Sequence, residues 1–133
     1  MRQVSRWTAA LLKQGASILS AGSGRHSLLV LMYHRVLPVA DPLLPEEPDL
    51  ATFTAQMDIL RAMCNVLPLT EAVDRLYRKS LPPRAACITF DDGYLNNLTY
   101  SVPTLVARGL PATIFVAAEF LCGGCMWTDI LME

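Results

Sequence analysis

The chain is 133 residues long, with 53% apolar and 17% charged residues. This composition is that of an ordinary globular protein, and the slight apolar excess is expected where buried parallel strands dominate. A formal net charge of -1 gives no general attraction to nucleic acid, so we expect no nucleic-acid partner. The charge is unevenly spread, because residues 1–40 hold five basic residues and no acid, and all twelve acids lie from Asp41 onward.

The basic start of the chain predicts an amphipathic helix over residues 2–21, where Trp7, Leu11 and Ile18 fall at helical spacing. Such a helix can lie on an anionic membrane surface, act as an organellar presequence, or pack against the rest of the fold. No secretory signal or membrane-spanning segment is evident, which favours a cytoplasmic or membrane-peripheral location. We divide the chain into this helix with a glycine-rich joint, residues 1–24, and one domain, residues 25–133.

The domain opens with a strand, a loop and a helix. The apolar run at 28–33 predicts the first strand, and the proline-rich stretch 38–48 can continue neither a strand nor a helix. Thr52 is expected to cap the helix that follows. The apolar face of this helix consists of Phe53, Met57, Leu60 and Cys64.

A second strand and helix are expected next. Residues 66–69 predict a short strand, and Thr70 is expected to cap the helix. The predicted inner face of that helix consists of Ala72, Val73, Leu76 and Tyr77. The two prolines in residues 80–84 then turn the chain into the next strand.

The run Ala85–Phe90, followed by Asp91, Asp92 and Gly93, is the most informative segment of the chain. Its apolar residues are typical of a buried parallel strand, and ligands bind at the carboxyl ends of such strands. Two adjacent carboxylates repel each other unless a metal, a shared proton or a cation compensates. Gly93 permits a turn that a β-carbon would oppose. One Asp would suffice to cap a helix, so the pair favours a functional site.

After this motif the pattern returns to helix and strand. Residues 95–108 predict a helix closed by Gly109, and Pro103 indicates that the helix starts late or is kinked. Residues 112–116 predict a further strand. Because the expected strands alternate with helices, the sequence predicts an α/β fold with a parallel sheet and right-handed crossovers.

These segments together resemble the metal-dependent polysaccharide deacetylases (carbohydrate esterase family 4, the NodB homology domain). The T-F-D-D-G motif of that family is complete at residues 89–93, and similar segments stand at 31–36, at Phe53-x-x-Gln56 and at 109–116. The resemblance runs from about Leu28 to the last residue. It implies a parallel-stranded, incomplete (β/α) barrel of the glycoside hydrolase and deacetylase type, since a full barrel needs about 250 residues.

The resemblance also implies roles for the carboxylates in hydrolysing the amide of N-acetylated sugars in a polysaccharide. Asp92 would bind a divalent metal, with zinc expected although cobalt, nickel or iron suit similar sites, and Asp91 would act as general base. The family's later H-x-x-x-H motif is absent, because the two histidines, His26 and His34, both precede the Asp pair. We therefore expect an incomplete metal site, the amino-terminal part of a catalytic domain, and no activity from this chain alone.

Three further residues are predicted to contact substrate: His34, Tyr94 and Trp127. His34 follows the first strand and can orient substrate or support the carboxylates, but a histidine hydrogen-bonded in the rim of the fold is an equal alternative. Trp127 can form a sugar platform or pack in the same rim.

The pair Cys122 and Cys125 has C-x-x-C spacing, which can serve zinc binding or thiol exchange. No second pair or nearby histidine completes a zinc site, so a glycine turn that carries two thiols is favoured. Cys64 and Cys87 lie in apolar segments and are expected in the core, and no disulfide is expected.

Two other functions are weighed against the deacetylase. Haloacid-dehalogenase-like phosphatases also place carboxylates after a buried strand, but in a D-x-D-G pattern that the adjacent Asp91 and Asp92 do not match. The second alternative is a non-catalytic deacetylase-like fragment, which keeps the first half of the fold without the histidines. The sequence leaves this alternative open.

Overall fold

The computed structural model describes residues 27–118 and residue 123. In chain order its elements are β1 (Leu29–Tyr33), α2 (Leu50–Met63), β2 (Asn65–Val66), α3 (Leu69–Tyr77), β3 (Ala85–Phe90), the π-helical turn η2 (Asn97–Ser101), α4 (Val102–Val106) and β4 (Thr113–Ile114). The predicted helix at 2–21, the boundary at residue 24, Cys122, Cys125 and Trp127 lie outside the described residues.

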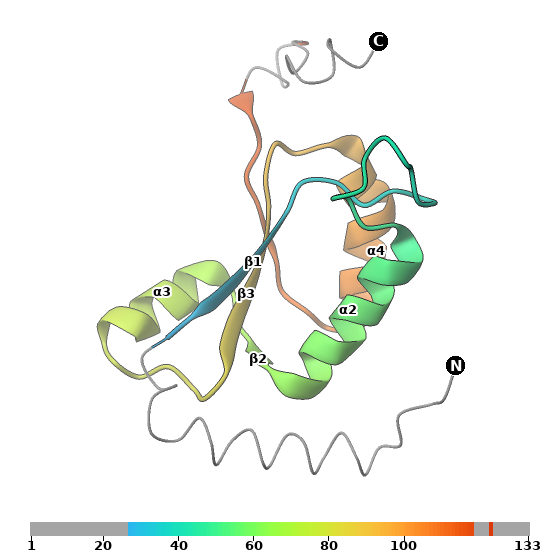
Figure 1. The fold of residues 1–133 in the computed structure, drawn as a ribbon. Helices are drawn as coiled ribbons and strands as arrows, with labels where there is room; N and C mark the ends of the chain where they lie inside the picture. The colour runs from blue at the N-terminus through green and yellow to red at the C-terminus, as the bar shows by residue number, and fades with distance from the viewer. Residues whose placement is uncertain (1–26, 119–122, 124–133) are drawn as a thin grey trace.

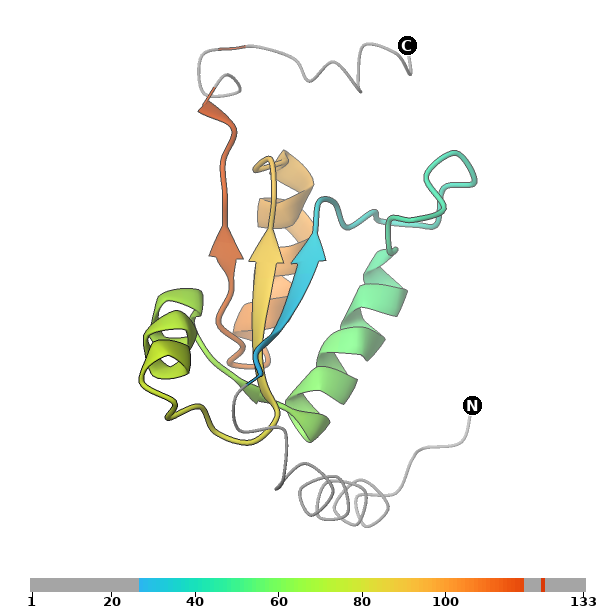
Figure 2. The same ribbon diagram turned by 60° about the vertical axis from the view of Figure 1, so that its left-hand side comes forward.

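The four strands form one parallel sheet with β3 at its centre. On one edge, β1 pairs with β3 over the whole length of β1, from Leu29 opposite Ala86 to Tyr33 opposite Phe90. On the other edge, β2 pairs with the start of β3 and β4 with its end. Figure 2 shows the arrows of β4, β3 and β1 side by side and pointing the same way. The prediction of an α/β fold with a parallel sheet is confirmed, whereas a full barrel is not shown by these residues.

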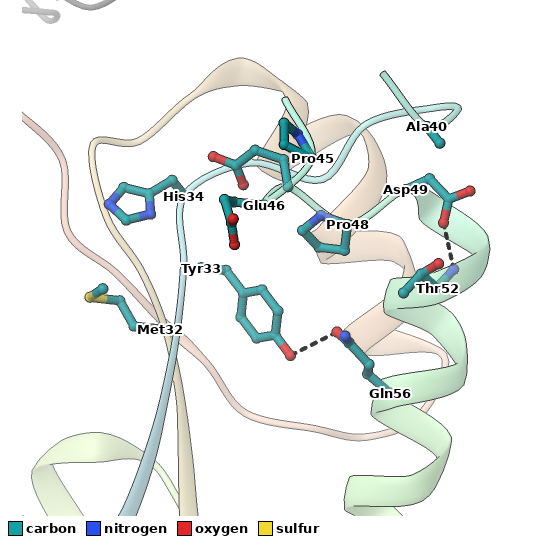
Figure 3. A pocket seen from close by; sticks show the side chains of 11 residues that line it. Met32, Tyr33, His34, Ala40, Pro45, Glu46, Pro48, Asp49, Thr52 and Gln56 are labelled. Carbon is teal, nitrogen blue, oxygen red and sulfur yellow. Dashed lines mark hydrogen bonds between the residues drawn. The ribbon is translucent and has the colours of Figure 1, made fainter. Parts of the chain in front are cut away.

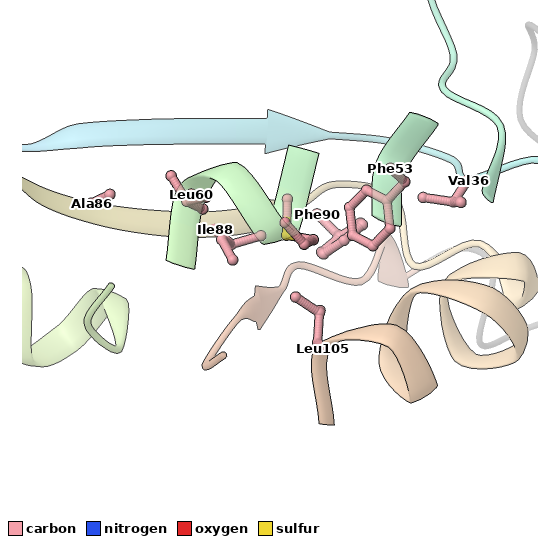
Figure 4. Packing of buried hydrophobic residues seen from close by; sticks show 8 residues of the cluster. Val36, Phe53, Leu60, Ala86, Ile88, Phe90 and Leu105 are labelled. Atoms are coloured by element: carbon pink, nitrogen blue, oxygen red, sulfur yellow. The ribbon is translucent and has the colours of Figure 1, made fainter. Parts of the chain in front are cut away.

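Helices cover both faces of β3, with α2 and α4 on one side and α3 on the other (Figure 1). Alternate residues of a strand point to opposite faces, and β3 is buried at all six positions. Ala86, Ile88 and Phe90 therefore join a core with α2 and α4 (Figure 4), while Ala85 and Cys87 join a second core with α3. This double burial explains why the strand is apolar throughout.

Three aromatic rings connect β1, α2 and β3 at the carboxyl end of the sheet. The ring centroid of Tyr33 lies 5.2 Å from that of Phe53, in an edge-to-face pair, and 5.5 Å from that of Phe90. Phe53 and Phe90 are 6.0 Å apart. Such pairs each stabilise a core by about 0.5–1.5 kcal/mol beyond the area they bury, so this end of the sheet is firmly fixed to α2.

The helix starts differ from two of our predictions. Asp49 caps α2, because its side chain accepts a hydrogen bond from the Thr52 amide at 2.8 Å, so Thr52 is inside the helix rather than its cap. Pro68 precedes α3 and offers no side-chain cap, so Thr70 lies within its first turn.

The predicted inner face of α3 is half right. Ala72 is buried and Leu76 is partly buried, but Val73 and Tyr77 are exposed, Tyr77 by 83%. The side of α3 that packs against β3 consists of Leu69, Ala72 and Leu76. Val73 and Tyr77 lie next to this side on the helix surface, outside the contact.

The segment after β3 confirms the expected effect of Pro103. Helical backbone runs without a break from residue 95 to residue 106, and Pro103 lies just after the π-helical turn η2 within it. The irregularity expected at this proline is therefore a widened turn inside the helix. Gly109 adopts a φ of 63° after the helix, as expected for a residue that ends it. Arg108 ties this end to α2 by two hydrogen bonds to Asp58, at 2.8 and 3.1 Å.

One face of β1 stays open. Val30 and Met32, which point away from α2, are exposed by 47% and 60%, and no strand among the described residues pairs with the outer edge of β1. Within the same residues, every helix is too short or too polar to cross a bilayer.

The packing of α2 predicts a contrast between two of its apolar residues. Met57 is fully buried in the core with β3, whereas Ile59 on the same helix is 59% exposed. Met57→Ala should lower the free energy of unfolding by about 2–5 kcal/mol, and Ile59→Ala by about 0.5 kcal/mol or less. Urea unfolding followed by circular dichroism measures both, and similar losses would contradict this packing of α2.

Candidate active site

Asp91 and Asp92 lie at the carboxyl end of the central strand, as predicted. The Asp91 amide donates a hydrogen bond of 2.9 Å to the carbonyl of Tyr33, which extends the β1–β3 ladder by one residue. Asp92 has a φ of 70°, in the left-handed region that few residues other than glycine adopt and that Asp tolerates. The backbone therefore turns sharply between the two carboxylates, which are both half-buried.

Gly93 completes this turn, and the structure shows two reasons for a glycine there. Its φ is 75°, and its amide donates to the Asp91 carbonyl at 2.9 Å. A β-carbon at this position would lie 2.9 Å from Cγ1 of Val116, closer than real contacts allow. The amide of Ala117 also donates to the Asp92 carbonyl at 3.3 Å, so the segment after β4 presses directly against the turn.

His34 follows β1 directly and is half-buried. Because Tyr33 pairs with Phe90, the register places His34 beside Asp91. Its backbone carbonyl accepts a hydrogen bond of 3.0 Å from the side-chain amide of Asn97, which is only 1% exposed. Asn97 in turn accepts a bond from the Ser101 hydroxyl at 3.3 Å. The π-helical turn thus holds the chain after β1 in place next to the Asp pair, and π-helical turns are frequent at functional sites.

Asn97 is a positioning residue that the sequence analysis did not identify. Its buried amide could have been suspected from its place six residues after Asp91, since a polar side chain inside a helix usually needs a partner. Nothing in the sequence indicated that this partner would be a carbonyl 63 residues earlier in the chain.

Tyr94 lies beside the same turn. The guanidinium of Arg35 stacks over its ring at 3.8 Å from the centroid, a cation–π contact. Arg35 also donates its backbone amide to the carboxylate of Glu47 at 3.2 Å. One face of the Tyr94 ring is therefore covered, and a sugar could stack only on the other face.

A pocket of about 440 Å³ lies at the outer edge of β1, between the loop after that strand and the start of α2 (Figure 3). The phenol of Tyr33 donates a hydrogen bond of 3.0 Å to Oε1 of Gln56 inside it, and burial raises the pKa of Tyr33. The complete lining is Met32, Tyr33, His34, Ala40, Pro45, Glu46, Glu47, Pro48, Asp49, Thr52 and Gln56. Sequence reasoning placed Tyr33, His34 and Gln56 in motifs but did not identify the pocket.

The structure brings Asp91, Asp92, His34 and Tyr94 to one end of the sheet, as the sequence analysis expected of them. It describes no group of three or more histidine, cysteine, aspartate or glutamate side chains that could hold a metal within residues 27–118 and 123. Zinc takes four ligands, at least three of them from protein, so the described residues do not by themselves fit a zinc site. Cys64 is half-buried and Cys87 is buried, in keeping with their expected place in the core.

Several solved structures are similar to this chain, and two of them are named as deacetylases. The first is IcaB from Ammonifex degensii, 34% identical over 68% of this chain, with a TM-score of 0.59. The second is a de-N-acetylase from Aggregatibacter actinomycetemcomitans, 26% identical over 65% of this chain, with a TM-score of 0.57. The third is the deacetylase PplD from Streptococcus pyogenes in complex with acetate; at 23% identity over 67% of this chain and a TM-score of 0.58, it supports the fold alone.

The alignments span 38%, 36% and 42% of these three proteins, so this chain corresponds to well under half of each. No family model and no curated protein matches the chain. The similar structures favour a deacetylase-type fold over the phosphatase alternative.

The tight turn predicts a difference between two glycines that share a left-handed backbone. A β-carbon at Gly93 would clash with Val116, whereas at Gly109 it would meet nothing within 4 Å. Both Gly→Ala changes should cost the left-handed penalty of about 1–2 kcal/mol, and Gly93→Ala roughly 1 kcal/mol more from the clash. Thermal or urea unfolding of both variants measures this, and an equal cost would show that the turn does not press against Val116.

Proposed function

We propose, because this chain resembles the polysaccharide deacetylase family in fold and sequence, that it provides part of a site that hydrolyses the amide of N-acetylated sugars in a polysaccharide. The observation that carries the proposal is the position of Asp91 and Asp92. They are the adjacent carboxylates of a complete T-F-D-D-G motif, at the carboxyl end of the central parallel strand. This is the edge of a parallel sheet where ligands bind.

The two carboxylates have different surroundings, which supports different roles. Asp91 continues the β1–β3 ladder beside His34, while Asp92 stands in the left-handed turn toward the segment after β4. In our proposal Asp91 accepts the proton of the attacking water as general base. The amide C–N bond then breaks as its nitrogen takes up a proton, the water oxygen leaves in acetate, and the sugar keeps a free amine.

We propose Asp92 as one ligand of a divalent metal, with zinc as the expected cation. When bound, such a cation lowers the pKa of water and polarises a carbonyl. The described residues do not complete the metal site, so the steps assigned here are those of this chain's own carboxylates. His34 and Tyr94 are the proposed substrate contacts, and Trp127 is a further one outside the described residues.

The described sheet is, in this proposal, part of an irregular (β/α) barrel. Support comes from three features: four parallel strands, helices on the α2 and α4 side, and an open face of β1. The substrate is an N-acetylated polysaccharide or oligosaccharide. Contact of residues 2–21 with a membrane surface also stays a proposal, which no described residue tests.

The metal proposal predicts weak zinc binding by the 133-residue chain, because a single carboxylate ligand offers too few donors. Calorimetry should find a binding free energy far below the roughly 10–16 kcal/mol of structural zinc sites. Asp92→Asn should abolish the remaining signal, whereas Asp74→Asn on the exposed side of α3 should leave it unchanged. Tight one-to-one binding would contradict the assignment and would bring Cys122, Cys125 or His34 into consideration as ligands.

Activity can be tested in a chimera that supplies the remainder of the fold. Residues 28–116 replace the aligned segment of the Aggregatibacter actinomycetemcomitans de-N-acetylase, and acetate release from its substrate is measured with zinc present. The chimera should release acetate, and Asp91→Asn should abolish release while sparing metal binding, because an amide cannot accept the proton. Asp92→Asn should weaken both metal binding and release.

The control is Asp74→Asn in the same chimera, which should retain full activity. A folded, metal-loaded chimera whose acetate release survives Asp91→Asn would rule out the proposed role of this residue. The 133-residue chain alone should release no acetate above its own Asp91→Asn variant.

A further inference from the structure

The pocket at the outer edge of β1 lies beside the turn that carries the Asp pair and shares only His34 with the proposed substrate contacts. Its lining comes from the end of β1, the loop after it and the first two turns of α2. A volume of about 440 Å³ is within the usual range for small-molecule sites, about 300–1,000 Å³. It is large enough for a sugar ring.

Among the aspartate, glutamate, lysine and arginine residues, only acidic ones line this pocket. Glu46, Glu47 and Asp49 line it, and no lysine or arginine does. Two of the three carboxylates are fixed in place by backbone amides, Glu47 by that of Arg35 at 3.2 Å and Asp49 by that of Thr52 at 2.8 Å. The hydrogen bonds from Thr52 lower the pKa of Asp49. The pocket therefore favours a cation over a neutral or anionic ligand.

The neutral part of the lining suits a sugar. Tyr33 and Gln56 are bonded to each other at 3.0 Å, so the phenol and the amide are oriented before any ligand arrives. The Tyr33 oxygen can still accept a hydrogen bond, and the Gln56 amide can donate two. An aromatic ring beside such groups is a common arrangement for a ligand with apolar faces and hydroxyl edges.

The pocket also lies one strand away from the Asp pair. Neighbouring strands are about 4.8 Å apart, and the Tyr33 carbonyl accepts the bond from the Asp91 amide. A polymer that crosses the end of β1 can therefore have one unit over the carboxylates and a nearby unit in the pocket. Hydrolysis of an acetamide leaves a free amine, which is protonated near neutral pH.

From this geometry we infer that the pocket binds a hexosamine unit with a free, protonated amine, so that the site prefers a polymer that is already partly deacetylated. The identity of the polymer rests on the proposed function, whereas the preference for an amine rests on the pocket. The ammonium group lies among Glu46, Glu47 and Asp49, and the ring lies against Tyr33 and Gln56.

The test compares two probes on the full 133-residue chain, a glucosamine hexamer and an N-acetylglucosamine hexamer, at a pH where the amines are protonated. Binding is followed by amide chemical shifts in NMR titrations. We expect the glucosamine hexamer to bind about tenfold more tightly, with a Kd that rises with salt. The largest shifts are expected in residues 32–34, 45–49 and 52–56.

Glu46→Gln combined with Glu47→Gln should remove this preference, because the amides keep the shape of the side chains without their charge. The matched control is Glu71→Gln, which removes an exposed carboxylate of α3 that pairs with Arg75 outside the pocket. Unfolding midpoints of both variants check that the fold is intact. If the variant does not fold, the single change Glu46→Gln at an exposed position should still lower the preference.

Equal affinity for the two hexamers, shifts centred outside the pocket, or the same loss from Glu71→Gln would overturn the inference. Its failure is distinguishable from that of the proposed function. An amine preference at the pocket without acetate release by the chimera would refute only the proposed function. Acetate release without any amine preference would refute only this inference.

Discussion

The pairing of β3 on both of its edges fixes the candidate site in space. Its hydrogen bonds to β1 continue one residue past the strand, where the Asp91 amide meets the Tyr33 carbonyl, and β4 pairs with its last two residues on the other edge. Since both faces of β3 are also buried, the strand cannot slide or rotate without breaking two cores. The two carboxylates are therefore attached to a rigid strand, which a catalytic site needs in order to hold its reactive groups in accurate positions.

Each neighbouring segment is held to this support by a different contact. The segment after β4 packs on Gly93 through Val116, the chain after β1 is held by Asn97, and the loop before α2 is held through Glu47 and Arg35. Segments far apart in the sequence therefore meet at one end of the sheet. The positive φ of Asp92, a conformation that Asp tolerates, lets the chain turn between the two carboxylates.

The local sequence was sufficient to predict those parts of the fold for which its residue pattern is compatible with only one structure. A fully apolar six-residue run that ends in Asp-Asp-Gly predicted the central strand and the position of both carboxylates, and Pro103 indicated the irregularity of the helix over residues 95–106. The cap of α2 was missed because Asp49 and Thr52 are both good capping residues, and only the path of the preceding loop decides between them. Tyr77 was misplaced because α3 touches the sheet along one narrow stripe. The pocket could not be predicted, since Tyr33, Glu47 and Gln56 meet only through the course of a proline-rich loop.

The open side of β1 has a consequence for handling the protein in solution. Its outer backbone groups meet no strand among the described residues, and the apolar side chains of Val30 and Met32 lie next to them. An unpaired, apolar edge is a template on which another strand can add. In the part of the chain that the structure describes, this edge is where self-association would begin, and a short peptide of matching strand sequence should compete for it.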